Sequence, residues 1–230
     1  MENLERKTSV IGVVGGKATG KTFTTEHHIK EYASDNPETG RKGRKVLIFD
    51  INLEYSDYEV LPLKDVKDFT SQEEVEIRRV ICIHPNKKIF TLEERIAALD
   101  VILKEFSGGL LVTEDAANQL LPSDPIKYNP IIAHRQLDLD IIFHVHELYY
   151  IPYEYWSAMD YLRIHHTTGS VWRVRDPKKI VAQYLQPIRL AELIVQYNRY
   201  ENDNKYYHCY FCFDTKTIKG KITLKSLRVA

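Results

Sequence analysis

The segment that most constrains the fold of this chain runs from residue 8 to residue 33. It begins with the apolar residues TSVIGVVGG (8–16), continues through GGKATGKT (15–22) and ends with KTFTTEHHIKEYA (21–33). The apolar part favours a buried strand, the glycines favour a tight turn, and the last part favours a helix. A strand that leads through a glycine turn directly into a helix is typical of α/β proteins, in which helices cover the sheet.

The turn has the spacing G-x-x-x-x-G-K-[ST]. Glycines let the backbone curl so that its N–H groups face a chain of phosphates, and the start of the next helix favours negative charge. Lysine at this position reaches the β- and γ-phosphates of a nucleotide, and the threonine hydroxyl binds Mg²⁺. We therefore predict a site for ATP and Mg²⁺ that consists of Gly15, Gly16, Lys17, Ala18, Thr19, Gly20, Lys21 and Thr22.

Further short apolar segments alternate with helical ones, and this pattern predicts a parallel sheet covered on both faces. The expected strands are 45–50, 78–83, 110–113, 139–146 and 161–167, and the expected helices are 91–106, 130–137 and a region near 188–199. Thr91 and Glu94 have the spacing of a capping box. The fold class is thus α/β, a P-loop NTPase with a mainly parallel central sheet flanked by helices.

The alternation stops after residue 170. We expect a P-loop ATPase core over 1–170 and a small C-terminal helix and β-hairpin appendage of the same domain over 171–230.

Two adjacent acids follow the apolar segment 110–113. Successive residues of a strand point to opposite faces, so Glu114 and Asp115 suit two different roles. We assign Glu114, together with Thr22, to Mg²⁺, and Asp115 to the attacking water. The alternative is a solvated acidic turn that caps the next segment.

The tip of the next expected strand carries histidine. His146 is placed to sense the γ-phosphate, while His144, on the same strand face, is expected to pack in the core. A metal-binding histidine pair and two histidines without a role are the alternatives.

These motifs together resemble the FtsK/HerA superfamily of DNA-pumping ATPases, which includes viral genome-packaging ATPases. The pieces are GGKATGKT, LIFDINLEY with Asp50, Glu54 and Tyr55, LLVTED, AHRQ with Arg135, and IIFHVHELYYIP, and they span roughly residues 8–166. The resemblance implies a ring, commonly a hexamer, in which an arginine reaches the neighbour's γ-phosphate. Arg135 is the first choice for that arginine and Arg163 the second, and a surface or structural role is the alternative for either.

Two departures from the superfamily pattern concern the chemistry. The acids that end the strand occur in the reversed order, Glu114 before Asp115, and His146 stands where the superfamily usually has glutamine. Both changes preserve a rough chemical capacity, but they leave hydrolytic competence open.

The amino-acid composition limits the kinds of partner that the chain is expected to bind. Lysine plus arginine equals aspartate plus glutamate, at 32 each, which argues against a strongly basic nucleic-acid coat but not against local basic patches. Two such patches, the loop 41–45 and the tail 215–230, are candidates for DNA contact, and a solvated loop and a protected edge strand are the alternatives. We expect no secretory signal and no transmembrane segment, and hence a host-cytoplasmic or virion-associated protein.

The leading functional hypothesis is an ATP-driven DNA-packaging or DNA-transfer motor of a virus or mobile element, with self, DNA and a capsid or membrane-associated assembly as partners. The predicted catalytic residues are Lys21, Glu114, Asp115, Arg135 and His146. One alternative is a nucleoside-type kinase, for which Arg163, Arg173 and Arg175 would serve a lid. The other is a nucleotide-binding assembly or morphogenesis module with little turnover.

Overall fold

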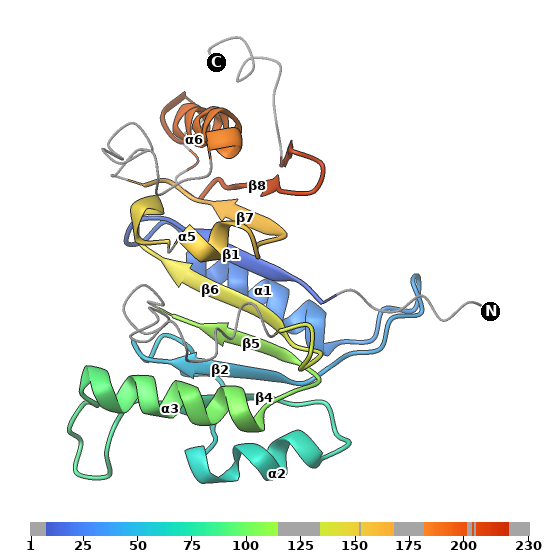
Figure 1. Cartoon of the computed structure of the whole chain (residues 1–230), viewed down its shortest axis with the longest axis vertical. Helices are drawn as coiled ribbons and strands as arrows, with labels where there is room; N and C mark the ends of the chain where they lie inside the picture. Colours follow the sequence, from blue (N-terminus) through green and yellow to red (C-terminus); the bar gives the residue numbers. More distant parts are fainter. Residues whose placement is uncertain are drawn as a thin grey trace. The chain divides into compact units, whose positions relative to one another are not determined.

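The computed structural model describes residues 8–114, 134–151, 153–167, 182–201, 204 and 206–220 (Figure 1). Within these residues, nine strands form one mixed sheet in the order β3-β4-β2-β5-β6-β1-β7-β8-β9. Most pairs are parallel, and helices flank the sheet, so the expected α/β fold is confirmed. The chain divides into two compact units. The first contains residues 8–10, 26–114 and 134–142, and the second contains 11–25 and the described residues from 143 onward.

The first unit contains two fully buried strands, β2 (Val46–Asp50) and β5 (Leu110–Thr113), and two that are more exposed, β3 (Glu59–Val60) and β4 (Ile77–Ile81). Strand β2 pairs in parallel with β4 on one side and with β5 on the other. Every residue of β2 and β5 is buried, as expected for strands that have covers on both faces.

Helix α3 (Leu92–Glu105) begins with the predicted capping box. The Thr91 side chain accepts a hydrogen bond from Glu94 N at 3.3 Å, and Thr91 N donates to Glu94 Oε2 at 2.8 Å. The turn η1 (Leu63–Asp65) and helix α2 (Val66–Ser71) precede it in the chain, and the Phe69 and Phe106 rings stack at 6.0 Å. The apolar face of α3 is buried at Ala98, Leu99, Ile102 and Leu103.

The helix predicted over 130–137 is not present in its described part. Residues 134–138 form a turn, in which Leu139 N donates to the His134 carbonyl at 2.9 Å, while residues 130–133 lie outside the described residues. Asp138 takes a positive φ of 48°, which no helix accommodates. The turn leads into β6 (Asp140–Val145), which passes from the first unit into the second.

The second unit contains β1 (Val10–Val14) from Ile11 onward, β7 (Tyr161–Ile164), β8 (Cys209–Cys212) and β9 (Thr217–Lys219). Strands β1 and β7 are parallel, whereas β8 and β9 continue the sheet in antiparallel pairing. The turn η3 (Leu148–Tyr150) and the short helix α5 (Tyr153–Trp156) connect β6 to β7.

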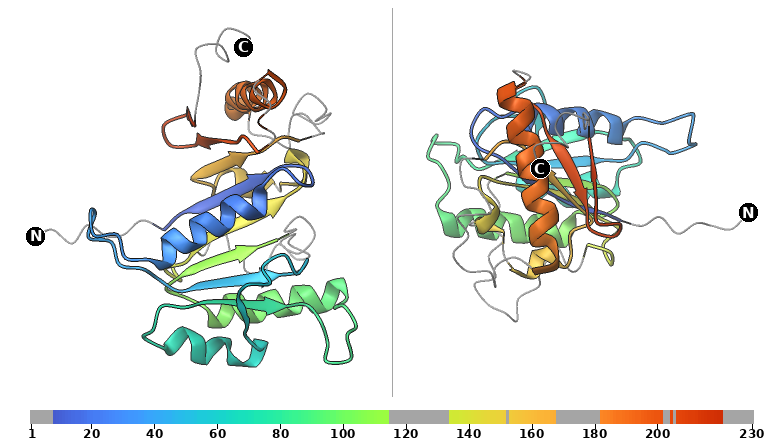
Figure 2. Two further views of the ribbon diagram at one scale, coloured as in Figure 1. Left: turned by 180° about the vertical axis from the view of Figure 1, so that it is seen from behind. Right: turned by 90° about the horizontal axis from the view of Figure 1, so that it is seen from above.

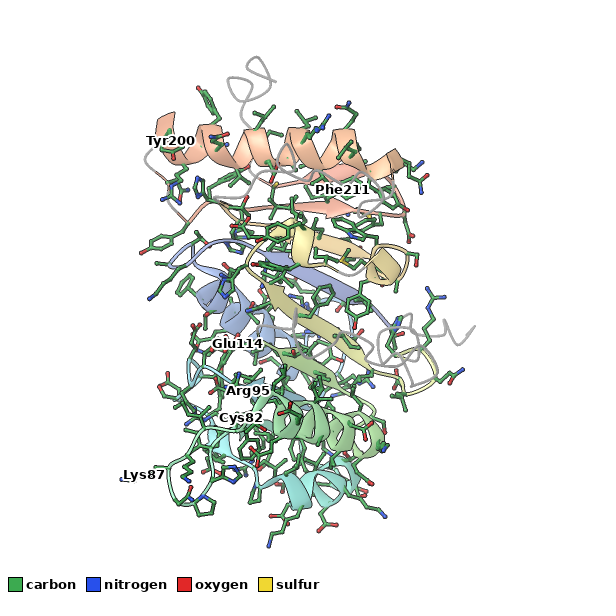
Figure 3. All side chains as sticks on the ribbon, turned by 60° about the vertical axis from the view of Figure 1, so that its left-hand side comes forward. Cys82, Lys87, Arg95, Glu114, Tyr200 and Phe211 are labelled. Atoms are coloured by element: carbon green, nitrogen blue, oxygen red, sulfur yellow. The ribbon has the colours of Figure 1, made fainter. Side chains whose placement is uncertain are left out.

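Helix α6 (Ala182–Glu201) lies alongside β8 in Figures 1 and 2, and Figure 3 shows Tyr200 on α6 and Phe211 on β8. The C-terminal helix and hairpin were predicted. The boundary at residue 170 lies outside the described residues, so the division into 1–170 and 171–230 stays a prediction. Along the described part of the chain, no helix has the length and apolar character that crossing a membrane requires.

Candidate functional site

The predicted phosphate loop, residues 15–22, connects β1 to α1 (Lys21–Ala33) as expected. Ala18 and Gly20 have φ values of 57° and 87°, which turn the backbone sharply before the helix starts. Gly20 is the residue that adopts this left-handed conformation without a side-chain penalty. The first turn of α1 directs its N–H groups toward the loop, which favours a bound anion.

Within the second unit, backbone hydrogen bonds hold the loop against the ends of β6 and β7. Gly15 N donates to the Val145 carbonyl at 3.3 Å, and Gly16 N donates to the His166 carbonyl at 2.8 Å. A Cβ on Gly15 would lie 2.6 Å from His165 Cβ, so only glycine fits there. The glycines of the motif therefore serve close backbone packing as well as the curl of the loop.

The ammonium group of Lys21 lies against the loop itself. Its Nζ donates to the carbonyl oxygens of Gly15 and Gly16 at 2.6 and 2.8 Å, and the Thr19 hydroxyl donates to the Gly16 carbonyl at 3.0 Å. The lysine is thus already held at the loop that its motif assigns to phosphates. The loop fits the phosphates of a nucleoside triphosphate, because a cation, a curled backbone and a helix N-terminus all attract negative charge there.

A buried polar network joins α1 to β6 and β7. The Thr25 hydroxyl lies 2.9 Å from His144 Nε2 and accepts a hydrogen bond from Arg163 Nη2. Arg163 is 0% exposed, and its guanidinium lies 5.9 Å from the centre of the Tyr210 ring. His144 therefore packs in the core, as the sequence indicated.

Burial and nearby cations keep His144 and His165 neutral. Burial lowers the pKa of His144 well below its usual range, and the Arg163 charge lowers it further. Burial also lowers the pKa of His165 to about 2, again with a contribution from Arg163. These two buried histidines therefore add no positive charge to that of Lys21 and Arg163 at neutral pH.

The two predicted arginines differ in accessibility. Arg163 is fully buried and cannot reach another subunit, so the second choice for an arginine that acts in trans is wrong. Arg135 is exposed in the turn before β6. His146 is exposed directly after β6, next to Val145, whose carbonyl accepts the hydrogen bond from Gly15. The roles of Arg135 and His146 stay predictions.

The acids of the first unit gather at the carboxyl ends of β2 and β5. The register pairs Phe49 with Thr113, so Asp50 and Glu114 follow at the same edge of the sheet. Asp50 is fully buried and pairs with Arg79 Nη1 at 2.8 Å. It also accepts a hydrogen bond from Glu54 N at 2.9 Å, which ties the loop after β2 to this edge.

Glu114 lies at the end of β5 (Figure 3) and is 2% exposed. Burial raises its pKa to about 8, and the nearby carboxylates of Glu54 and Asp50 add to this effect. At neutral pH Glu114 therefore holds a proton in most molecules. Asp115 lies outside the described residues, so its proposed action on water stays a prediction.

No family model matches the chain, and no curated protein sequence matches it. Among solved structures, the genome packaging NTPase B204 from Sulfolobus turreted icosahedral virus 2 is similar. Its complex with AMP has 18% identity and a TM-score of 0.58, covering 92% of this chain and 96% of that one. Its complex with ATP-gammaS has 16% identity and a TM-score of 0.60, covering 94% and 98%.

B204, the DNA-packaging ATPase from Sulfolobus Turreted Icosahedral Virus, has 16% identity and a TM-score of 0.58, covering 94% of this chain and 98% of that one. The chain shares the fold of these NTPases. The likeness extends over nearly the whole length of both chains, so it includes more than the phosphate loop.

The cationic side chains of the basic loop 41–45 contact other residues of the first unit. Arg41 donates to backbone carbonyls of Glu31 and Ser34, Lys42 pairs with Asp35, Arg44 pairs with Asp138, and Lys45 donates to the Thr70 carbonyl. Two of these four cations thus have carboxylate partners within the unit, and the other two donate to backbone carbonyls, so DNA contact at this loop stays a prediction. Residues 221–230 of the basic tail lie outside the described residues.

Three side chains of this region were not predicted from the sequence. Thr25 contacts His144 and Arg163 in the buried network, and His165 and Tyr206 contact the loop. A threonine three residues after Thr22 was a usable signal for Thr25, because residues three apart on a helix are neighbours on its surface. No local pattern distinguishes His165 or Tyr206, since their contacts span more than 140 residues.

Proposed function

We propose that the chain hydrolyses ATP to move DNA, as a packaging or DNA-transfer ATPase of a virus or mobile element. The observation that carries the proposal is the phosphate loop built around Lys21, within the fold of genome-packaging NTPases. Complexes of one such NTPase with AMPPCP and ATP-gammaS support a nucleotide as the ligand.

The chemistry assigns a role to each group. Lys21 neutralises charge on the β- and γ-phosphates, and Thr22 and Glu114 supply oxygen ligands for Mg²⁺. Mg²⁺, when bound, withdraws charge from the phosphate oxygens. Asp115 accepts a proton from the attacking water as the water oxygen bonds to the γ-phosphorus. The bond from that phosphorus to the bridging oxygen breaks, which yields ADP and phosphate.

The raised pKa of Glu114 adds a condition to this scheme. A protonated carboxyl group is a poor ligand, so Glu114 must release its proton to bind the cation. We also propose a ring of subunits, a hexamer, in which the exposed Arg135 acts on the neighbour's γ-phosphate and His146 senses that phosphate. A capsid or membrane-associated assembly in the host cytoplasm or the virion is the expected setting.

The test is ATP turnover with no DNA, single-stranded DNA and double-stranded DNA, together with the solution mass. The wild type should turn over ATP faster with DNA, and Lys21→Ala should lose this activity at least a hundredfold. Lys30→Ala, an exposed lysine in the last turn of the same helix, is the matched control and should keep it. A strictly monomeric protein whose turnover ignores DNA would contradict the motor.

A nucleotide-binding assembly module with little turnover is the second candidate. The proton that Glu114 retains near neutral pH, together with the reversed order of the acids, favours it. Tight Lys21-dependent ATP binding with negligible hydrolysis, with or without DNA, would decide for this module.

A further inference from the structure

An aromatic ring from the C-terminal part of the second unit lies on the phosphate loop. A Cβ placed on Gly20 would come within 3.1 Å of Tyr206 Cδ1 and 3.7 Å of Tyr206 Cγ, so the ring covers the Gly20 backbone. Tyr206 nonetheless remains 53% exposed as a residue. A large aromatic surface is therefore available immediately beside the loop that receives the phosphates.

The neighbours of Tyr206 hold the chain firmly at this point. Tyr207 is buried, and its N–H donates to the Asn204 carbonyl at 3.1 Å. The His208 ring stacks on His165 with centres 4.9 Å apart and planes 23° apart. His165 Nδ1 in turn lies 3.0 Å from the Thr19 carbonyl of the loop. Contacts on its C-terminal side thus tie the backbone that carries Tyr206 to the loop itself.

We propose that Tyr206 is the stacking platform for the base of the bound nucleotide. This inference rests on the proposed nucleotide site. A nucleoside triphosphate that places its outer phosphates in the loop has its base at the other end of the same small molecule, so the base meets a surface near the loop. Planar bases stack favourably on tyrosine, and stacking tolerates any base because each has a π-face.

If Tyr206 stacks on the base, then different residues bind the triphosphate group and the base of the nucleotide. The loop and Lys21 bind the triphosphate group, whereas Tyr206 binds the face of the base and makes no use of its edge. The site should therefore prefer nucleotides to bare polyphosphate, with little distinction between ATP and GTP.

The experiment is calorimetric binding of ATP, GTP and inorganic tripolyphosphate to the wild type, Tyr206→Ala and Tyr206→Phe. Tyr206→Ala should weaken ATP and GTP about tenfold, or about 1.4 kcal/mol, and leave tripolyphosphate unchanged. Tyr206→Phe keeps the ring and should bind all three ligands like the wild type. Tyr149→Ala, an exposed tyrosine in η3, is the matched control and should change none of them.

Equal weakening of ATP and tripolyphosphate would show that Tyr206 only supports the loop, and no weakening of either would also overturn the platform. In both cases ATP binding that depends on Lys21 would leave the proposed function standing. Wild-type ATP binding that Lys21→Ala does not reduce would instead overturn the nucleotide site and the platform together.

Discussion

The surroundings of the phosphate loop and the acid cluster at the ends of β2 and β5 differ in the sign of the charge that their buried groups avoid. In the second unit, Arg163 is buried against Thr25 of α1, and the nearby His144 and His165 remain neutral because burial and the cations disfavour a further proton. In the first unit, buried Asp50 and Glu114 share an edge, and Glu114 remains neutral by keeping its proton. One region limits its positive charge and the other its negative charge.

The difference shows how each region suits its proposed ligand. Lys21 supplies a fixed cation at the loop, and buried His144 and His165 add no positive charge to it at neutral pH. An acid cluster that retains a proton can release it when a cation arrives, so cation binding there depends on pH. Four substitutions test this contrast, and they follow from the largest expected effect to the smallest.

Arg79→Met should cause the largest loss, because it removes the cation that pairs with fully buried Asp50. We expect the free energy of unfolding to fall by about 3 kcal/mol at pH 7, since one partner of a buried pair is left alone. Chemical denaturation measures this value. Arg78→Met on the same strand is the control, because its ion pairs are with Glu59 and Glu76, which are more exposed than Asp50. Equal losses in both variants would contradict a special role for Asp50.

Glu114→Gln should change the pH dependence of stability without nucleotide or Mg²⁺. The folded-state pKa is raised to about 8, above the ordinary 4.5, so the stability that protonated Glu114 contributes is fully present below pH 4.5 and is lost as the pH rises through 8. Glutamine removes this loss, which should make the variant more stable by on the order of a few kcal/mol at pH 9. Thermal unfolding between pH 4 and 9 measures the difference. A constant difference at all pH values would mean that folding does not raise the pKa of Glu114.

His165→Gln should change the stability of the protein at acidic pH. The folded-state pKa is lowered to about 2, below the ordinary 6.5, so the stability that neutral His165 provides is present above pH 6.5 and is lost as the pH falls. The variant should therefore lose less stability between pH 7 and pH 4.5 than the wild type, by about 2 kcal/mol. Denaturant midpoints at the two pH values give the comparison. His27→Gln, an exposed histidine on α1, should behave like the wild type.

Arg163→Met should have the smallest effect on stability, within about 1 kcal/mol. It replaces a buried cation that bonds to the Thr25 hydroxyl by an apolar side chain of similar length, and such replacements are often neutral. The same change should weaken tripolyphosphate binding and raise the pKa of His165, which NMR titration follows. A loss as large as that of Arg79→Met would show that the two arginines are equivalent.

The sequence predicted the features that depend on neighbours along the chain. The passage from β1 through Gly20 into α1, the buried strand before Glu114, and the capping box of Thr91 and Glu94 all follow from local spacing. Such patterns are readable because backbone conformation and hydrophobic period are short-range properties. The helix expected at 130–137 failed over its described residues, because Asp138 turns the chain immediately before β6.

Only the tertiary structure decided which charges are buried together. Arg163 is an ordinary strand residue in the sequence, and its burial against Thr25 depends on contacts across 138 residues. The register of β2 with β5 brings Asp50 beside Glu114, and that neighbour helps to raise the glutamate pKa. Tyr206 reaches Gly20 through the pairing of β7 with β8. Desolvation and charge proximity arise from the packing of distant segments. The acids and the loop could therefore be predicted from the sequence, whereas their protonation and their neighbours depend on the fold.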